Sequence, residues 1–244
     1  MLTPLQKERY SRHLGKISEG EQESLLSKHV VQVGIGGLGS PLAYYLVAMG
    51  IGTLTLIEYD TVSISNLNRQ ILYSIPDLGS LKTDVAKIKL NELNPDVKIN
   101  IINAKLTNKN YADYISDADY LVDASDSAQT KFLVNDIGIK MNIPFTIAGV
   151  REFEGQLMSV IPHKTACYRC VFGKSDIEGA LDNYSDPIGI FGFTAGTLGA
   201  MQAAEVIKGL LRKEGRLLNT LIMVDLEQMQ FLQVKLSKNP KCFC

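Results

Sequence analysis

A glycine-rich segment near the start of the chain has the residue types and spacing of a phosphate-binding turn. The sequence VVQVGIGGLGS, residues 30–40, places Gly34, Gly36 and Gly39 in the pattern G-x-G-x-x-G. Glycines at this spacing permit a tight strand-to-helix turn and let backbone N–H groups approach a phosphate. Glu58 follows nineteen residues after the last glycine, where an acid can reach a ribose hydroxyl. The pattern also occurs in sites for NAD, FAD or S-adenosylmethionine, and in purely structural turns.

The segment after Glu58, EYDTVSISNLNRQILY, is densely polar for a loop that leaves a strand. It brings Asn66, Asn68, Arg69 and Gln70 into a few consecutive residues. A triphosphate needs cations and hydrogen-bond donors, whereas a nicotinamide site rarely needs so many polar groups there. The segment therefore favours a phosphate-rich ligand, and a solvated loop with an incidental arginine is the alternative.

Two further charged positions fit the same ligand. Lys82 is the first residue of a predicted helix, where the helix dipole repels a lysine. A bound anion removes this conflict, because it attracts both the ammonium group and the positive end of the dipole. Asp123 and Asp126 end a predicted strand in LVDASDS, and carboxylates facing phosphates are natural ligands of Mg²⁺. The alternatives are a surface lysine and a helix N-cap near Ser127.

Four cysteines form two close pairs far apart in the sequence. Cys167 and Cys170 make one pair, and Cys242 and Cys244 make the other. Structural zinc sites are built in this way, because a tetrahedral ion can tie two distant segments together through four thiolates. The spacing of the second pair is unusual, because alternate side chains of an extended chain point to opposite sides. Both can bind one ion only if the backbone folds at Phe243, and four free thiols are the alternative.

The elements that must position these residues alternate between strands and helices. Strands are predicted at 28–34, 53–59, 97–103, 119–125 and 144–150, and helices at about 4–16 and at 39–50, 82–94, 110–117 and 130–142. Further on, the pattern predicts strands at 156–162, 220–226 and 230–237 and a long helix at about 193–211. The alternation predicts an α/β fold, Rossmann-like and doubly wound, with a mostly parallel sheet, antiparallel C-terminal strands and a structural zinc site.

Length and composition set the broad class. The chain has 244 residues, 45% of them hydrophobic and 21% charged, and we expect a single domain. Within it we expect an N-terminal helical arm (1–27), a nucleotide-binding part (28–155) and a part with the crossover loop, zinc site and last strands (156–244). A net charge of −1 gives no basic surface for nucleic acid. The N-terminus lacks the apolar core of a signal peptide and the segment at 192–211 is too polar to span a membrane, so we expect a cytoplasmic protein.

Together, GIGGLGS, IEYDTVSISNLNRQ, Lys82, DASDS, CYRC and the last cysteine pair after NP resemble the ThiF/MoeB/HesA family. The likeness runs in order from RYSRHL to the last residue, and DTVSISNLNRQ is its most specific motif. The resemblance implies a homodimer that uses ATP and Mg²⁺, and its cysteine pairs fit a Zn²⁺ site. It would adenylate the C-terminal glycine of a small ubiquitin-like sulfur-carrier protein that ends in Gly-Gly.

The resemblance also implies roles for individual residues. Nucleotide binding is assigned to Gly36, Gly37, Glu58, Ser65, Asn66, Leu67, Asn68, Arg69, Gln70, Lys82, Asp126 and Ser127, and zinc binding to Cys167, Cys170, Cys242 and Cys244. Arg69, Lys82 and Asp126 are also expected to be catalytic. Arg12, the second arginine of RYSRHL, matches an arginine that reaches into the partner subunit's site; by composition alone it is a solvated residue.

The sequence departs from the family in two places. Glu58 replaces the usual aspartate, which lengthens the arm by one methylene but keeps a carboxylate for the ribose. Residues 171–192, the crossover loop, contain no cysteine, although some relatives carry one that bonds to the activated carrier. We therefore expect the reaction to stop at the acyl-adenylate, with sulfur coming from a separate donor.

Three other functions remain open at this point. A tRNA threonylcarbamoyladenosine dehydratase also activates a carboxylate with ATP, although the neutral charge and cysteine pairs speak against a tRNA substrate. An NAD-dependent oxidoreductase could use the same glycine turn. A noncatalytic zinc-bearing module could bind a carrier without ATP turnover.

Overall fold

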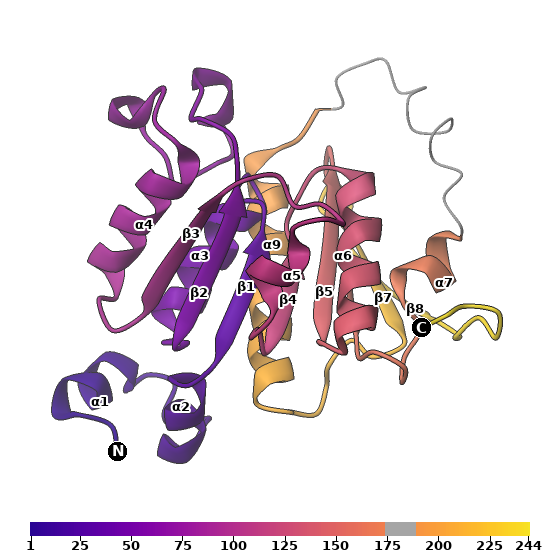
Figure 1. Cartoon of the computed structure of the whole chain (residues 1–244), viewed down its shortest axis with the longest axis horizontal. Coiled ribbons are helices and arrows are strands. Elements are labelled where there is room, and N and C mark those ends of the chain that lie inside the picture. Colours follow the sequence, from indigo (N-terminus) through magenta and orange to yellow (C-terminus); the bar gives the residue numbers. More distant parts are fainter. Residues whose placement is uncertain (174–188) are drawn as a thin grey trace.

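The computed structural model describes residues 1–173 and 189–244, which build one eight-stranded sheet (Figure 1). Its strands are β1 (His29–Val33), β2 (Thr53–Glu58), β3 (Lys98–Asn103), β4 (Tyr120–Asp123), β5 (Phe145–Arg151), β6 (Glu154–Val160), β7 (Thr220–Asp225) and β8 (Gln230–Lys235). They lie in the order β3-β2-β1-β4-β5-β6-β7-β8. Strands β1 to β5 are parallel, and β6, β7 and β8 pair antiparallel, which confirms the predicted fold class.

The order of the parallel strands decides where a ligand can bind. The chain moves outward from β1 to β2 and β3 and then returns to β4 on the other side of β1. The connections that leave the carboxyl ends of β1 and β4 therefore run in opposite directions, and a crevice opens between them at this edge of the sheet. The glycine turn follows β1 and DASDS follows β4, so both predicted phosphate-site segments meet there.

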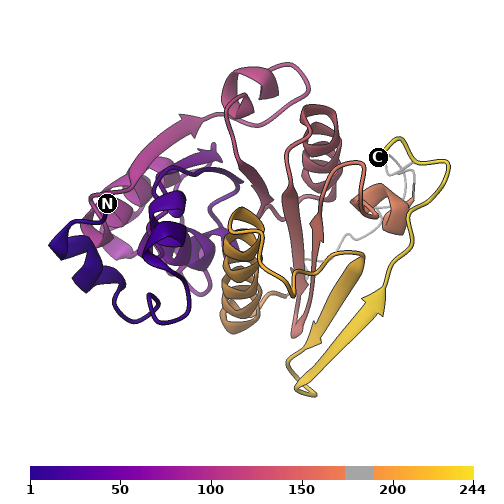
Figure 2. The same ribbon diagram turned by 90° about the horizontal axis from the view of Figure 1, so that it is seen from below.

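Helices cover both faces of the sheet (Figure 2). One face carries α3 (Gly39–Ala48), α4 (Lys82–Leu93) and the long α9 (Gly192–Leu210). The other carries α5 (Tyr111–Ile115) and α6 (Ala128–Met141), against which α7 (Tyr168–Phe172) packs. The polar loop after β2 contains two 3-10 turns, η1 (Ile64–Asn66) and η2 (Ile75–Asp77).

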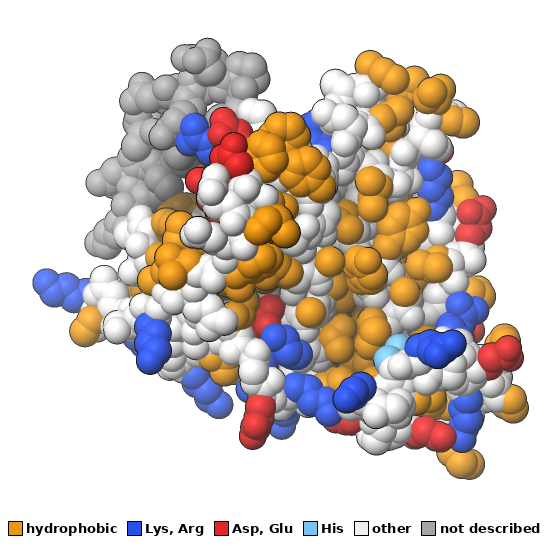
Figure 3. All heavy atoms as spheres, turned by 180° about the vertical axis from the view of Figure 1, so that it is seen from behind, with side chains coloured by type: hydrophobic (Ala, Val, Ile, Leu, Met, Phe, Trp, Pro, Cys, Tyr) orange, Lys and Arg blue, Asp and Glu red, His pale blue; other side chains and the backbone are white. Residues whose placement is uncertain are grey.

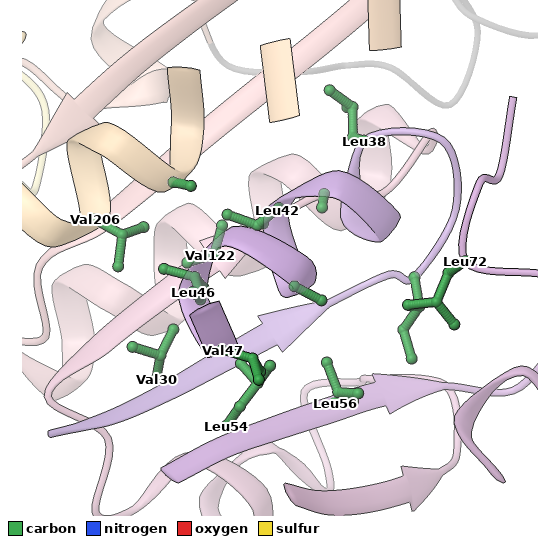
Figure 4. Packing of buried hydrophobic residues seen from close by; sticks show 14 of the residues in the cluster. Val30, Leu38, Leu42, Leu46, Val47, Leu54, Leu56, Leu72, Val122 and Val206 are labelled. Atoms are coloured by element: carbon green, nitrogen blue, oxygen red, sulfur yellow. The ribbon is translucent and has the colours of Figure 1, made fainter. Parts of the chain in front are cut away.

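The larger core lies between the sheet and the layer of α3 and α9. Leu42 and Leu46 of α3 are fully buried against Val30 of β1 and Leu54 of β2 (Figure 4). Val206 of α9 closes the same cluster. Burying each side chain of this size contributes about 1.5–3 kcal/mol. This packing holds the glycine turn rigidly, because α3 begins directly after it.

The N-terminal arm differs from the prediction of one helix over residues 4–16. Helix α1 (Pro4–Tyr10) ends at Tyr10, and a second helix, α2 (Glu19–Leu25), follows after a turn. Tyr10 is fully buried and its hydroxyl accepts a hydrogen bond from Asn94, so the chain must turn there to keep this contact. The second helix has a sequence signal that the prediction missed, since Ser18 and Glu21 form a capping box.

Candidate active site

A cavity of about 510 Å³ lies at the carboxyl ends of β1, β2, β4 and β5, where the strand order reverses. Nine predicted site residues line it: Gly36, Gly37, Glu58, Asn66, Arg69, Gln70, Lys82, Asp126 and Ser127. Ser65, Leu67 and Asn68 do not line it, as far as the described residues show. These three residues stabilise the loop instead. Leu67 packs on the core, and Ser65 and Asn68 accept hydrogen bonds from Arg69.

The glycine turn is shaped by close backbone approaches that side chains would prevent. Gly34 has a φ of +92°, and a Cβ there would lie 2.8 Å from the carbonyl oxygen of Ala124. A Cβ on Gly37 would lie 3.1 Å from the Cβ of Ala195, at the start of α9. The turn thus forms a shallow cradle at the amino end of α3, where backbone N–H groups can bind an anion. Within the described residues, no side chain caps that end.

Glu58, the last residue of β2, is held by backbone N–H groups. Its Oε1 accepts hydrogen bonds from the N–H groups of Tyr59 at 2.8 Å and Asp60 at 3.1 Å. Its Oε2 accepts one from Ile35 in the glycine turn at 3.2 Å. A carboxylate has about four acceptor positions, so one remains for a ligand hydroxyl. Glu58 therefore joins the turn to the polar loop and still faces the cavity.

Arg69 is aimed by the loop that carries it. Its Nη1 donates to the carbonyl oxygen of Ser65 at 2.9 Å and to Oδ1 of Asn68 at 3.0 Å. Among the described residues no protein group accepts a hydrogen bond from the other guanidinium donors, which can face phosphate oxygens and bind them in a fork. The short η1 turn creates this arrangement, because it brings the Ser65 carbonyl back over Arg69.

Lys82 at the start of α4 lies on the same cavity. Its Nζ is 3.1 Å from Oδ2 of Asp60, and its side chain is only 4% exposed while that of Asp60 is 53% exposed. A lysine at a helix N-terminus would be repelled by the helix dipole. The carboxylate of Asp60 offsets this repulsion and holds the ammonium at the cavity wall.

Acidic groups also line the cavity, at Glu58, Asp60 and Asp126. Burial raises the pKa of Tyr59, and the negative charges of Asp60, Glu58 and Asp126 raise it further. Asp126 is exposed in the turn after β4, and Ser127 caps α6 through a hydrogen bond to the N–H of Thr130. The alternative predicted for Ser127, a helix N-cap, is thus correct, and its neighbour still presents a carboxylate to the cavity. An oxygen-rich wall of this kind suits Mg²⁺ beside a phosphate.

Lys131 and Asp123 form a buried ion pair next to this part of the cavity, and none of the sequence motifs assigns a role to Lys131. The Nζ of Lys131 is 2.7 Å from Oδ2 of Asp123, and both side chains are at most 9% exposed. The lysine also lines the cavity. A detectable signal exists, because Lys131 shares the buried face of α6 with Asn135 and Gly138 at helical spacing, where a lysine needs a partner.

Arg12 lies far from this cavity within its own chain. It is exposed in the turn after α1, and the arm packs against Gly50–Gly52 at the amino end of β2, opposite to the cavity (Figure 1). Arg12 therefore does not reach the cavity of its own chain, and its role in a partner's site stays a prediction.

A second cavity of about 420 Å³ lies on the antiparallel strands. Its lining includes Met223 of β7 and Leu232 of β8, which are cross-strand neighbours and are 45% and 59% exposed. Gly149 and Val150 of β5 line both cavities, so the two adjoin at this strand. Figure 3 shows the face of the molecule seen from behind the view of Figure 1, with apolar side chains spread across both halves of it.

The four cysteines meet at one point between α7 and the C-terminal tail. Sγ atoms are 3.8 Å apart for Cys167 and Cys170, 3.6 Å for Cys167 and Cys242, and 3.4 Å for Cys170 and Cys244, and all four lie within 4.8 Å of one another. Tetrahedral zinc with bonds of about 2.3 Å separates its sulfurs by about 3.8 Å, so the residues fit zinc.

The tail solves the spacing problem of Cys242 and Cys244 by folding at Phe243, whose side chain points outward and is 57% exposed. Burial opposes ionisation of Cys170, but N–H groups of Asn239 and Cys167 lower its pKa to about 7.

Comparison with known proteins decides the family. Residues 10–244 match the ThiF family over nearly the whole chain. The chain belongs to the ThiF family. A sulfur carrier protein adenylyltransferase from Thermus thermophilus is 36% identical over 193 residues, which cover 77% of this chain and 70% of that protein. A SAMP-activating enzyme E1 from Haloferax volcanii is 36% identical over 243 residues, covering 99% and 89%.

A solved structure supports the same relationship. The crystal structure of E. coli MccB with MccA-N7isoASN has a TM-score of 0.86 at 27% identity, and the match covers 97% of this chain and 74% of that one. A separate observation concerns membranes: among the helices of the described residues, none is long and apolar enough to cross one.

Proposed function

We propose that this ThiF-family protein is an adenylyltransferase that activates the C-terminal glycine carboxylate of a small ubiquitin-like sulfur-carrier protein with ATP. One observation carries the proposal. A cavity lined by cations, among them Arg69 and Lys82, and by the carboxylate of Asp126 adjoins, at Gly149, a second cavity on the antiparallel strands. The relatives named for sulfur-carrier and SAMP activation support this substrate class.

The junction between the cavities suits a narrow peptide end. Gly149 presents no side chain where the two cavities join, so a glycine-ended tail could pass along β5 to the nucleotide. Met223 and Leu232 offer an apolar platform for the folded body of the carrier. The carrier would thus dock on β7 and β8 and extend its last residues into the nucleotide site.

The chemistry follows from the charges. A carboxylate is a weak nucleophile, and both reactants are anionic, so the barrier is mainly one of repulsion and positioning. The carboxylate attacks the α-phosphorus, the bond to the β-phosphate oxygen breaks, and pyrophosphate leaves with that electron pair. Arg69 and Lys82 neutralise the phosphates during this step, while the glycine cradle and Glu58 hold the phosphates and the ribose.

Two metal ions fit the residues present. Mg²⁺ would be held near Asp126 and would supply positive charge to the phosphate oxygens. Zn²⁺ would be held by the four cysteines and would attach the tail to α7, with no part in the reaction.

We further propose a homodimer in which the exposed Arg12 of each arm completes the site of its partner. This arrangement makes a sharp prediction for a 1:1 mixture of Arg12→Ala and Lys82→Ala proteins after subunit exchange. Each mixed dimer has one site with both defects and one intact site, so about a quarter of the wild-type activity returns. No recovery, although mixed dimers form, would place Arg12 in its own subunit's site or in none.

Sulfur would come from a separate donor. Residues 171–192 contain no cysteine, and the part of this loop at 174–188 lies outside the described residues. After incubation with carrier and ATP, mass spectrometry should find acyl-adenylate on the carrier and neither a thioester nor a persulfide on this protein. A covalent adduct would contradict the proposal.

The decisive test is ATP–pyrophosphate exchange with a panel of carriers that end in Gly-Gly. Exchange is expected only with a matching carrier, and deletion of the terminal glycine should abolish it. Binding of NAD with hydride transfer, or ATP-dependent exchange without any carrier, would refute the assignment.

A further inference from the structure

Lys131 reaches into a gap that opens between two neighbouring strands at the edge of the active site. The pairing of β4 with β5 runs from Leu121 opposite Phe145 to Asp123 opposite Ile147 and then stops. Beyond this point β4 turns away toward Asp126, while β5 continues past Gly149. The backbone groups at this divergence need other partners.

The ammonium of Lys131 satisfies groups on both diverging strands. Its Nζ is 2.7 Å from Oδ2 of Asp123, 2.7 Å from the carbonyl oxygen of Ser125 and 2.7 Å from that of Ala148. The first two acceptors belong to β4 and its turn, and the third belongs to β5. Lys131 is therefore a cross-link between the turn that presents Asp126 and the strand that presents Gly149.

The number of N–H donors on Lys131 shows whether it can bind a ligand or only positions the protein groups around it. A lysine ammonium has three protons, and all three have an acceptor here. It cannot bind a phosphate without giving up one of these bonds, although it lines the cavity. Its stem also lies beneath the junction of the two cavities, since a Cβ on Gly149 would be 3.7 Å from the Cε of Lys131.

The carboxylate of Asp123 extends the cross-link into the turn. While Oδ2 accepts from Lys131, Oδ1 accepts from the hydroxyl of Ser125 at 2.5 Å. Gln202 of α9 donates to the carbonyl oxygen of Asp123 from the other face of the sheet at 2.7 Å. Asp123 is fully buried and cannot itself reach a ligand, so its bonds fix the turn that ends at Ser127.

We propose that Lys131 is a positioning residue that sets the distance and orientation between the metal-binding turn at Asp126 and the β5 segment at Gly149 that receives the acyl substrate. This inference rests on the proposed function for the identity of the substrate. Neither the sequence motifs nor the cavity-facing cations assign such a role to Lys131, which acts through Asp123, Ser125 and Ala148.

The test removes both charges at once, so that no buried charge is left alone. The double variant Lys131→Met with Asp123→Asn is compared with Lys28→Met with Asp119→Asn. The Lys28–Asp119 pair, with Nζ and Oδ1 3.0 Å apart, lies just before the amino end of β4, is more exposed than the Lys131–Asp123 pair, and serves as a control for the loss of an ion pair away from the cavity. Affinity for ATP is measured by calorimetry with Mg²⁺ and with EDTA, and amide hydrogen exchange is followed at residues 124–127.

In wild type, Mg²⁺ should raise the affinity for ATP above the affinity measured in EDTA, and we call this ratio the magnesium gain. In the Lys131 double variant we expect the magnesium gain to be about 10- to 100-fold smaller, while the ATP affinity in EDTA stays within a few-fold of wild type. Pyrophosphate exchange should fall by a similar factor, and amides 124–127 should exchange faster. The Lys28 control should keep all three properties. Retention of the magnesium gain and of slow amide exchange in the folded Lys131 variant would overturn the proposal.

Two further measurements keep the test decisive. If the double variant does not fold, Ser125→Ala is used instead, because it removes only the hydrogen bond from the Ser125 hydroxyl to Asp123. The magnesium gain should then fall about fivefold. An unchanged magnesium gain would refute the positioning role of Lys131. The magnesium measurement needs no carrier. If wild-type protein shows no exchange with any carrier, the proposed function fails while the role of Lys131 is still tested.

Discussion

The role of Lys82 allows a prediction in which activity and stability separate. Lys82→Ala removes an ammonium that lines the nucleotide cavity and is 3.1 Å from Asp60. Lys89→Ala is a matched control, because Lys89 lies on the same helix α4 but pairs with Asp77 and is absent from the cavity lining among the described residues.

The structure sets the size of each effect. A cation about 4 Å from a phosphate charge, in surroundings with an effective dielectric constant near 20, contributes about 4 kcal/mol. Loss of one such donor typically costs about 10²–10³-fold in kcat. The effect on folding is smaller, because Asp60 is 53% exposed and remains solvated without its partner. We expect the free energy of unfolding to change by about 1 kcal/mol or less.

The assay is pyrophosphate exchange at saturating carrier, paired with urea unfolding of the same preparations. Lys82→Ala should lose exchange by about two to three orders of magnitude and unfold near the wild-type urea concentration. Lys89→Ala should keep its exchange rate. If Lys82→Ala retained exchange within threefold of wild type, Lys82 would be a structural partner of Asp60 and the phosphate role would be wrong.

Three shorter predictions follow from other parts of the structure. Removal of zinc by a chelator should expose residues 239–244 to proteolysis and lower the free energy of unfolding by about 2.7 kcal/mol at zinc 100-fold above Kd, while ATP affinity is kept. Leu232→Glu should raise the KM for carrier at least tenfold and leave ATP affinity unchanged, as measured by exchange kinetics and calorimetry. The third concerns Asp77. Burial opposes its ionisation, but Lys89 and Ser74 lower its pKa overall, so its stabilising effect is present above the unfolded pKa and is lost as pH falls through the folded one. Asp77→Asn should therefore cost about 1 kcal/mol in urea unfolding at pH 7 and nothing near pH 2. Equal costs at both pH values would contradict the assignment.

Local patterns predicted the strands and most helices because each has a short-range cause. The apolar run before Gly34 and the helix after Gly39 are dictated by β-branched residues and by the glycines themselves. The missed boundary at Tyr10 has a long-range cause, because the helix stops where Tyr10 must remain buried beside Asn94. The capping box at Ser18 is local and could have been used.

The residues of the candidate site likewise fall into those that sequence patterns identified and those whose placement only the structure shows. Gly37, Glu58, Arg69, Lys82 and Asp126 were identified from their types and order, and the structure brings them around one cavity. Ser65, Leu67 and Asn68 belong to the same motif but do not line the cavity among the described residues, because the folded loop turns Leu67 onto the core and leaves Ser65 and Asn68 exposed beside Arg69. No sequence spacing distinguishes these two groups, since the direction of each side chain depends on the turn.

By itself, the sequence determined the alternation of strands and helices, the glycine turn with its acid, and the four thiols that can hold zinc. These depend on backbone freedom, periodicity and ligand chemistry, which are properties of neighbouring residues. Only the tertiary structure decided that Cys242 and Cys244 both reach Cys167 and Cys170, that Arg12 lies at the end of the sheet opposite to the cavity, and that Lys131 bridges β4 and β5. Those relations join residues distant in sequence, and they arise from the packing of helices on a sheet whose strand order reverses at β1.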